Sequence, residues 1–162
     1  MTSREGAGER RGVEDRQAQT LADAAGRALF ARDRASNALG MRLVEVRPGY
    51  ARVSMTVRAD MLNGIDACHG GIIFSLADSA FAFACNSHNV ATVAAAASID
   101  FLCPANGGDE LTAEVRELWR SKRNGLYEVT VSNQSGRRIA LFRGRSYSIG
   151  GEIIPDGEAG QR

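Results

Sequence analysis

Apolar positions in the first part of the chain recur at helical spacing. Between Gln17 and Asn37 they fall three and four residues apart, which predicts a helix over residues 17–37 that is stopped by Gly40. The recurring positions are Leu21, Ala24, Ala25, Ala28 and Leu29. Residues 1–16 are instead rich in Gly, Arg and Glu and offer almost nothing to bury, so we expect them to form a disordered tail.

Alternating or β-branched residues mark the strands. Residues 41–60 predict two strands joined by a turn at Pro48–Gly49. Later in the chain we expect further strands in four segments that are separated by turn-forming residues. These segments are residues 90–102, 111–120, 126–133 and 138–150. Residues 151–162 lack such a pattern, and we expect them to form a flexible tail.

One segment between the strands has a different pattern. Residues 69–86, HGGIIFSLADSAFAFACN, are apolar around most of the helical circumference, which is typical of a buried helix. A long helix among strands that are joined by tight turns predicts an α+β fold in which an antiparallel sheet packs on that helix. We expect a single domain over residues 17–150, which includes the N-terminal helix.

Asp78 is the only charged residue between His69 and Asn86. With Ser75, Ser79 and Ala82 it forms a narrow, partly polar stripe, because these positions follow the i, i+3, i+4, i+7 spacing. Asp78 lies too deep in the helix to cap its start or to gain much from the helix dipole. On pattern alone, a functional role and a structural or solvent-facing role are equally compatible with this position.

Two glycines begin the same helix. Gly70 and Gly71 each cost about 1 kcal/mol relative to Ala inside a helix, yet they let a ligand approach the backbone closely. Free N–H groups at a helix N-terminus bind anions, including a carbonyl oxygen that gains negative charge. The start of the helix lies about 12 Å from Asp78, too far to share one reacting group within a chain. Two antiparallel helices across a homodimer interface would bring both features together.

Charge and cysteine content narrow the class of protein. The chain of 162 residues has 20 Lys and Arg against 19 Asp and Glu, which does not suit a nucleic-acid partner. Three widely spaced cysteines, Cys68, Cys85 and Cys103, fit reduced thiols rather than a disulfide framework or a zinc site. No segment has the apolar length of a signal peptide or membrane span. We expect a cytoplasmic protein without a membrane partner.

The motif N-G-x-x-x-x-H-G-G, followed by F-S-L-A-D-S-A-F-A-x-A-x-N-S, resembles the PaaI-type (phenylacetate-pathway) acyl-CoA thioesterases of the hotdog-fold superfamily. The downstream stretches S-I-D-F-L-x-P and A-L-F-R-G-R-S are similar as well, so the resemblance spans roughly residues 40–150. It implies a hotdog fold, in which a curved antiparallel sheet wraps one long central helix. It also implies homodimers that pair into homotetramers, and hydrolysis of an acyl-CoA thioester without metal or cofactor.

The resemblance assigns catalytic roles to four residues. Asp78 matches the carboxylate that acts as nucleophile or general base, and the backbone N–H of Gly70 matches the donor that polarises the thioester carbonyl. Asn63 matches the residue that positions the carbonyl or the attacking water. His69 lies within the motif, where it orients the loop or contacts the substrate; a plain hydrogen bond to the loop is favoured over acid–base catalysis.

Further residues are candidates for holding the substrate. Gly71 allows close approach to the backbone, and Ser98 is a candidate hydrogen-bond partner. Phe74, Phe81 and Phe83 are more typical of core residues than of an acyl pocket, and among them Phe81, one turn beyond Asp78, is the best candidate to line a pocket. Coenzyme A carries phosphates, which a basic cluster near a predicted turn would suit, although such clusters are also common on solvated turns. The cluster comprises Arg120, Lys122 and Arg123.

The favoured function is hydrolysis of an acyl-CoA, with aryl substrates such as (hydroxy)phenylacetyl-CoA. One alternative is a non-catalytic acyl-CoA-binding module, which would not need Asp78. A second alternative is a hotdog hydratase or dehydratase. That chemistry needs an acid and a histidine together, whereas His69 lies far from Asp78 along the helix.

Overall fold

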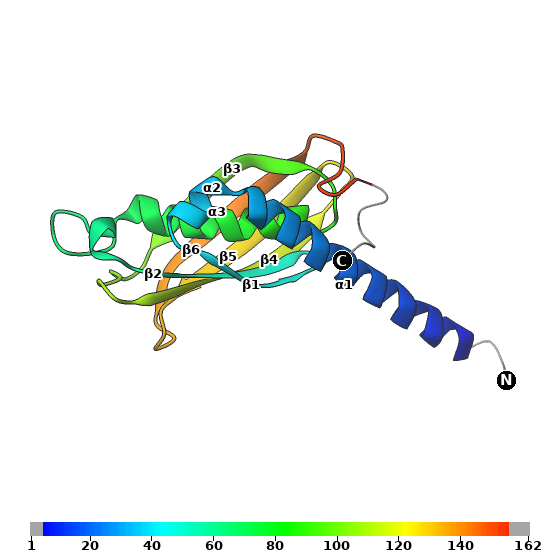
Figure 1. Ribbon diagram of the computed structural model, residues 1–162, viewed down its shortest axis with the longest axis horizontal. Coiled ribbons are helices and arrows are strands. Elements are labelled where there is room, and N and C mark those ends of the chain that lie inside the picture. The colour runs from blue at the N-terminus through cyan, green and yellow to red at the C-terminus, as the bar shows by residue number, and fades with distance from the viewer. Residues whose placement is uncertain (1–4, 156–162) are drawn as a thin grey trace.

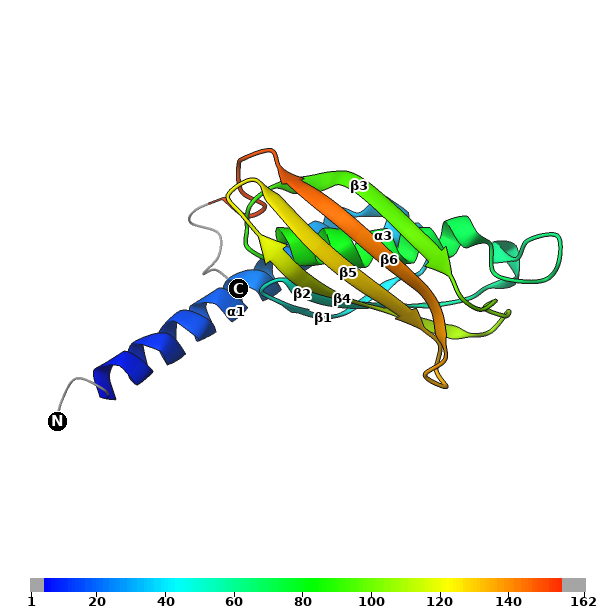
Figure 2. The same cartoon turned by 180° about the vertical axis from the view of Figure 1, so that it is seen from behind.

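The computed structural model describes the backbone of residues 5–155 and the side chains of residues 12–155. Its centre is a six-stranded antiparallel sheet in the order β1-β2-β4-β5-β6-β3, curved around one long helix (Figures 1 and 2). The strands are β1 (Arg42–Arg47), β2 (Tyr50–Thr56), β3 (Thr92–Phe101), β4 (Glu110–Arg120), β5 (Asn124–Ser132) and β6 (Arg138–Ser148). The α+β fold with a sheet wrapped around a central helix is thereby confirmed.

The central helix is α3 (Gly70–Asn86), which matches the segment expected from the sequence. Its alanines Ala77, Ala80 and Ala84 are fully buried, so the backbone of the helix lies close to the strands. Phe81 packs edge-on against Tyr127, with ring centroids 5.2 Å apart. Gly144 makes this packing possible, because a Cβ atom there would lie 2.9 Å from the Phe81 ring.

Two helices cover the side of α3 that faces away from the sheet. They are α1 (Glu5–Arg32) and α2 (Arg34–Ala38), separated at Asp33, whose side chain caps α2. Gly26 of α1 allows close packing on β1, because a Cβ atom there would lie 2.8 Å from the Val46 side chain. The sequence pattern therefore locates the packed part of this layer over residues 17–37, but it misses the break at Asp33.

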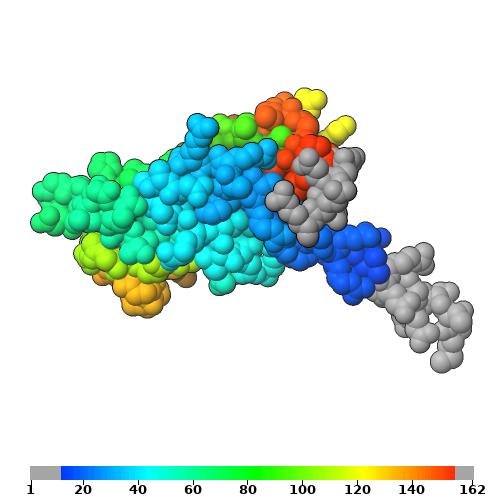
Figure 3. All heavy atoms as spheres, viewed as in Figure 1, coloured from blue at the N-terminus to red at the C-terminus, as the bar shows by residue number. Residues whose placement is uncertain are grey.

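The first helix is longer than the expected segment, and part of it reaches beyond the body of the molecule (Figure 3). Residues 5–16 are helical, whereas the sequence predicts a disordered tail over residues 1–16. Glu and Arg supply six of these twelve residues and have high helix propensity, which favours a helix even though three glycines oppose it and little surface is buried. Residues 1–4 lie outside the described residues.

The expected C-terminal tail is partly packed. Ile154 is buried, and the side-chain amide of Asn89 accepts a hydrogen bond from its N–H at 2.9 Å and donates one to its carbonyl at 3.1 Å. These bonds hold residues 151–155 against the loop that follows α3. The remainder of the predicted tail, residues 156–162, lies outside the described residues.

Strand β3 forms one edge of the sheet and pairs only with β6. Every residue of this ten-residue strand is at least partly exposed, and its middle consists of small side chains. A long edge strand without charged side chains in its middle is a site at which another strand can pair. A bulge between Ala94 and Ala96 interrupts the alternation, so the faces of later residues follow from their partners across the strand.

Candidate active site

The start of α3 presents one free backbone donor. His69 caps the helix, because its Nδ1 atom accepts the N–H of Gly71 at 3.0 Å and its carbonyl accepts the N–H groups of Ile72 and Ile73 at 2.9 and 3.3 Å. The N–H of Gly70 has no acceptor within the described part of the chain. A free N–H at the positive end of a helix dipole suits a carbonyl oxygen that is gaining negative charge.

Asn63 lies in the loop that leads to this helix. Its Oδ1 atom accepts the backbone N–H groups of Ile65 and Ala67 at 3.0 and 3.2 Å, and its own N–H donates to the Ala67 carbonyl at 2.7 Å. These bonds fix the orientation of the side-chain amide. Because Oδ1 is occupied, the Nδ2 group of Asn63 is the part that can donate to a ligand.

Asn63 and Gly70 share a cavity of about 370 Å³. Apart from these two polar positions its walls are mainly apolar, and none of the lining residues carries a formal charge at neutral pH. The other lining residues are Ile65, Ala67, Cys68, Ile73, Phe101, Leu102, Cys103 and Pro104. Ile65 and Phe101 are 83% and 52% exposed, so apolar surface stands open beside the Gly70 donor. The cavity suits an uncharged group attached to a carbonyl.

Asp78 is half-buried in the middle of α3 and has no hydrogen-bond or ion-pair partner among residues 12–155. Burial raises the pKa of its carboxyl group above the ordinary aspartate value. The neighbouring hydroxyls are engaged elsewhere, since Ser75 donates to the Gly71 carbonyl and Ser79 bonds to Ser36 of α2. Eight residues of helix place Asp78 about 12 Å from Gly70, so one chain does not bring both to the same carbonyl.

Two predicted substrate-binding residues lie elsewhere. Phe81 is buried against Gly144, Tyr127 and Phe142 in the core and lines none of the cavities described here. Ser98 pairs with Arg143 on the outer face of the sheet, whereas the next residue, Ile99, pairs with the buried Phe142 on the face that carries α3. Neither side chain therefore points toward Asn63 or Gly70.

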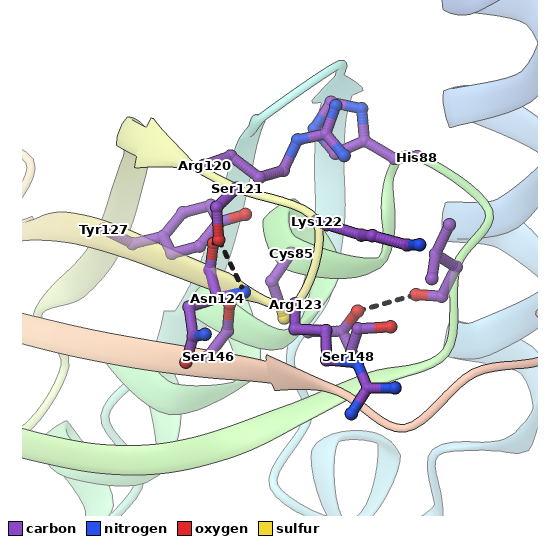
Figure 4. Close-up of a pocket in the computed structure, with 12 residues that line it drawn as sticks. Cys85, His88, Arg120, Ser121, Lys122, Arg123, Asn124, Tyr127, Ser146 and Ser148 are labelled. Atoms are coloured by element: carbon purple, nitrogen blue, oxygen red, sulfur yellow. Dashed lines mark hydrogen bonds between the residues drawn. The ribbon is translucent and has the colours of Figure 1, made fainter.

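The predicted basic cluster lines a separate cavity at the other end of α3. Arg120, Lys122 and Arg123 of the β4–β5 hairpin surround it together with Cys85 and His88 (Figure 4). The structure thus brings the three basic residues together around a cavity, but within one chain it places them at the opposite end of the helix from Gly70.

A hydrogen-bonded group of side chains lies beside this cavity and is not predicted by any sequence motif. Glu117 Oε2 accepts the Tyr127 hydroxyl at 2.7 Å and lies 3.0 Å from His88 Nε2. The Arg120 guanidinium is 3.5 Å from the other carboxylate oxygen. Glu117, Tyr127 and His88 come from three different segments of the chain, so no local sequence motif predicts that they meet. Burial raises the pKa of the neighbouring Cys85 thiol to about 12, which keeps it protonated and unreactive.

The described residues hold no group of three or more His, Cys, Asp or Glu side chains that could bind a metal ion. Cys68, Cys85 and Cys103 are all free thiols in the structure. None of the helices within residues 5–155 has the length and apolarity needed to cross a membrane.

Comparison with known proteins gives a consistent result. Residues 66–140, which include Gly70 and Asp78, match the family model of the thioesterase superfamily. The acyl-coenzyme A thioesterase PaaI of Escherichia coli is 48% identical over 132 residues, which cover 82% of this chain and 93% of that protein.

Solved structures agree with the sequence match. The structure of the E. coli PaaI protein from the phenylacetic acid degradation operon superposes with a TM-score of 0.82 at 46% identity, covering 83% of this chain and 97% of that one. A Streptococcus mutans protein bound to acetyl-CoA superposes with a TM-score of 0.67 at 26% identity, covering 69% of this chain and 90% of that one.

Proposed function

Because the chain belongs to the PaaI-type acyl-CoA thioesterases of the hotdog superfamily, which hydrolyse thioester bonds, we propose that Asp78 and Gly70 of two different subunits form its active site. The observation that carries this proposal is a complementary pair of unsatisfied groups on one helix. The Gly70 N–H lacks an acceptor and the Asp78 carboxylate lacks a donor among the described residues. They lie about 12 Å apart in one chain, so a second chain is needed to combine them.

The chemistry follows from these two groups. The thioester carbonyl oxygen accepts a hydrogen bond from the Gly70 N–H and from Asn63 Nδ2, which stabilise the oxyanion that forms on attack. As a general base, Asp78 of the partner subunit takes a proton from the attacking water; the tetrahedral intermediate then breaks its C–S bond, and the proton passes to the CoA thiolate, giving the free acid and the CoA thiol. As a nucleophile, Asp78 attacks the carbonyl and the CoA thiolate leaves; water then hydrolyses the resulting acyl–Asp78 anhydride, which releases the acid and restores the carboxylate. One such donor contributes about 10²–10³ in rate, and a positioned base about 10²–10⁴.

The electrostatics of Asp78 support this role. Burial raises the pKa of the carboxyl group, so the ionised form is a stronger base than an exposed aspartate. No hydrogen bond within the described residues stabilises that ionised form. His69 has a different role, because its Nδ1 atom is used to cap the helix. It is a residue that positions the loop rather than an acid or base.

The dimer is expected to form along β3. Its exposed edge can pair with the same strand of a second copy in antiparallel fashion, which continues the sheet and brings the two α3 helices side by side in opposite directions. This arrangement places the start of each α3 near the middle of the other. We further propose that two such dimers pair into a homotetramer.

The substrate is proposed to be an aryl acyl-CoA such as phenylacetyl-CoA or its hydroxylated forms. The cavity beside Gly70 is uncharged and mainly apolar, which suits an aromatic acyl group and disfavours one that ends in a carboxylate. The E. coli relative is described as a protein of the phenylacetic acid degradation operon, which is consistent with this choice.

The test is thiol release from phenylacetyl-CoA and a panel of aliphatic and dicarboxylic acyl-CoAs, with wild type and Asp78→Asn compared. We expect the aryl substrate to be preferred, and Asp78→Asn to lose at least about 10²-fold in kcat while its oligomeric state is unchanged. Equal rates for both proteins would assign Asp78 a structural role. Binding of acyl-CoA without hydrolysis by either protein would instead support a binding module.

A further inference from the structure

Two cysteines that the proposed reaction does not use lie in the wall of the cavity beside Gly70. Cys68 comes just before α3 in the chain, and Cys103 comes just after β3. The backbone N–H of Cys68 donates to the Ala105 carbonyl at 2.8 Å, and the residues next to this pair form an antiparallel bridge. The two segments therefore run side by side, and both thiols belong to one cavity.

Cys103 is the accessible thiol of the two. Cys68 is only 5% exposed, its Sγ atom contacts the His69 carbonyl at 3.8 Å, and burial, together with the charge of Asp109, raises the pKa of its thiol. Cys85 is buried in the wall of the other cavity (Figure 4). All three cysteines lie within the described residues, and Cys103 alone is partly exposed. A reagent that reaches the cavity therefore meets Cys103 first.

The proposed reaction brings a second sulfur to the same cavity. A thioester whose carbonyl oxygen is bound by the Gly70 N–H carries the CoA sulfur on its carbonyl carbon, and hydrolysis releases that sulfur as the CoA thiol. We propose that Cys103 is a redox modification site, at which CoA is held as a mixed disulfide that blocks the cavity and stops hydrolysis. The inference rests on the proposed function, because the Gly70 donor is what places the CoA sulfur beside this wall.

The modification is an exchange of one disulfide for another. Its oxidant is CoA disulfide, in which two CoA molecules are joined through their sulfur atoms. The Cys103 thiolate attacks one of these sulfurs, the S–S bond of CoA disulfide breaks, and a bond forms between Cys103 Sγ and that CoA. The other CoA leaves as a thiolate and takes up the proton that Cys103 lost. Cys103 is thereby oxidised and one CoA is reduced to its thiol, and a reducing thiol reverses the exchange.

Cys68 is poorly placed to release the adduct by forming an internal disulfide. It lies opposite Ala105, so Cys103, two residues before Ala105, is its diagonal neighbour across the two segments. Diagonal neighbours have Cα atoms about 7–8 Å apart, whereas disulfides usually join Cα atoms about 4.4–6.8 Å apart. The mixed disulfide therefore persists until an external thiol removes it, and the attached CoA occupies the cavity until then.

The substrate site favours CoA disulfide over other disulfides. An acyl-CoA thioesterase binds the CoA part of its substrate, and CoA disulfide carries the same part. Binding raises the concentration of the disulfide at Cys103 relative to a disulfide that has no site. The lining residues carry no formal charge at neutral pH, so no carboxylate opposes the thiolate that attacks.

Mass spectrometry of the intact protein tests the inference without turnover. Wild type, Cys103→Ser and Cys85→Ser are incubated with CoA disulfide, and peptide mapping of wild type locates the adduct independently of any substitution. We expect one CoA per chain on wild type and on Cys85→Ser, attached at Cys103 and removed by dithiothreitol, and no adduct on Cys103→Ser. An adduct at Cys68 or Cys85 instead, or none on wild type in excess CoA disulfide, would overturn the inference.

Glutathione disulfide is the control for a site that CoA binding directs. We expect it to modify Cys103 at least about tenfold more slowly than CoA disulfide does. Asp78→Asn should be modified as fast as wild type, because the exchange uses no carboxylate. An adduct in a protein that hydrolyses no acyl-CoA would therefore reject the proposed function and leave the modification site standing. Equal rates for the two disulfides would show an ordinary exposed thiol and reject the site.

An activity measurement decides whether the adduct blocks the cavity. Each protein is treated with CoA disulfide, freed of unbound reagent and assayed through the loss of thioester absorbance, and its rate is divided by that of the same protein untreated. Wild type should lose activity in proportion to the fraction modified and regain it in dithiothreitol, whereas Cys103→Ser should keep its own untreated rate. Full activity of completely modified wild type would contradict the blocking role.

Discussion

His69 Nδ1 accepts the backbone N–H of Gly71 at 3.0 Å, so this amide at the start of α3 is not free to bind a ligand. The His69 carbonyl accepts the next two amides, so of the first four amides of α3 only the Gly70 N–H has no acceptor within the described residues. The motif His69–Gly70–Gly71 thus leaves a single backbone N–H, that of Gly70, available to donate to a ligand. An oxyanion hole is effective when its donors are held in place before the charge develops.

The capping role of His69 can be separated from acid–base catalysis by two substitutions. His69→Asn keeps a side-chain acceptor for the Gly71 N–H and should retain activity within a few fold. His69→Ala removes the acceptor and should lower the free energy of unfolding by about 1 kcal/mol, with a larger loss of activity than His69→Asn. Thermal unfolding and thiol release measure both effects. A loss of 10²-fold or more in both variants would instead identify His69 as an acid or base.

Gly70 is expected to be needed for access to its own N–H. In Gly70→Ala the new Cβ atom would lie 3.0 Å from the Phe101 ring, which would have to shift to make room beside the Gly70 N–H. We expect kcat/KM to fall at least about tenfold, although Ala is the better helix former. Gly64→Ala is the matched control in the preceding loop, because its Cβ atom would have no neighbour within 4 Å. Similar activities of the two variants would show that the start of α3 does not approach the substrate.

The sequence predicts α3 and most strands because burial leaves a periodic signal. An almost wholly apolar segment of this length is a buried helix, and alternation marks β2, β4 and β5. β-Bulges limit this prediction, because an extra residue in a strand reverses which side chains face the core. The one between Ala94 and Ala96 shifts the alternation in β3, and Ser98 consequently lies on the outer face, away from the site. A single sequence does not reveal where a bulge falls.

The site was partly predictable for a similar reason. His69, Gly70 and Asp78 lie on one continuous segment, so their spacing follows from helix geometry alone. Contacts between distant segments are not encoded in this way. The Glu117, Tyr127 and His88 group and the cavity around Arg120–Arg123 arise only when the β4–β5 hairpin folds against the end of α3. The spacing of Phe81 makes it a candidate to line a pocket as well as a core residue, and the absence of a side chain at Gly144 leaves room for its ring in the core.

The raised pKa of Asp78 predicts a gain of stability on neutralisation. Folding raises this pKa through burial, so the folded chain retains the proton to a higher pH than the unfolded chain. The contribution of Asp78 to stability is therefore full below the unfolded pKa and declines as the pH rises through the folded pKa. Asp78→Asn should unfold at a higher temperature than wild type at pH 7, and the difference should shrink toward the ordinary aspartate pKa of about 4. A lower melting temperature at pH 7 would contradict this.

The same shift sets the acid limb of the pH–rate profile. Asp78 must be ionised to act as base or nucleophile, so kcat/KM should rise with pH through the folded pKa of the free enzyme. Because burial raises that pKa, the midpoint should lie above that of an exposed aspartate. Initial rates with the best acyl-CoA across a pH series measure it. A midpoint at or below the ordinary value would show that the carboxylate is better solvated or better hydrogen-bonded than the structure indicates.

The shared active site predicts that activity depends on the β3 edge. Ala97 lies opposite Gly144 on the face that carries α3 and is exposed in the single chain. In the proposed dimer, Ala97→Glu would bury two carboxylates at the interface between the β3 strands, which is strongly unfavourable without cationic partners. We expect a folded monomer that has lost at least about 10²-fold in activity, since each site loses half of its catalytic groups.

Light scattering after size-exclusion chromatography, together with thiol release, tests this dependence, and Val44→Glu provides the control. Val44 is half-exposed on β1 at the other edge of the sheet, so a charge there should leave both the dimer and the activity intact. A monomeric Ala97→Glu variant with full activity would mean that one chain completes the site. An Ala97→Glu variant that stays dimeric and active would place the interface elsewhere. If Ala97→Glu alone loses both the dimer and the activity, pairing along β3 is what brings Gly70 of one chain to Asp78 of the other.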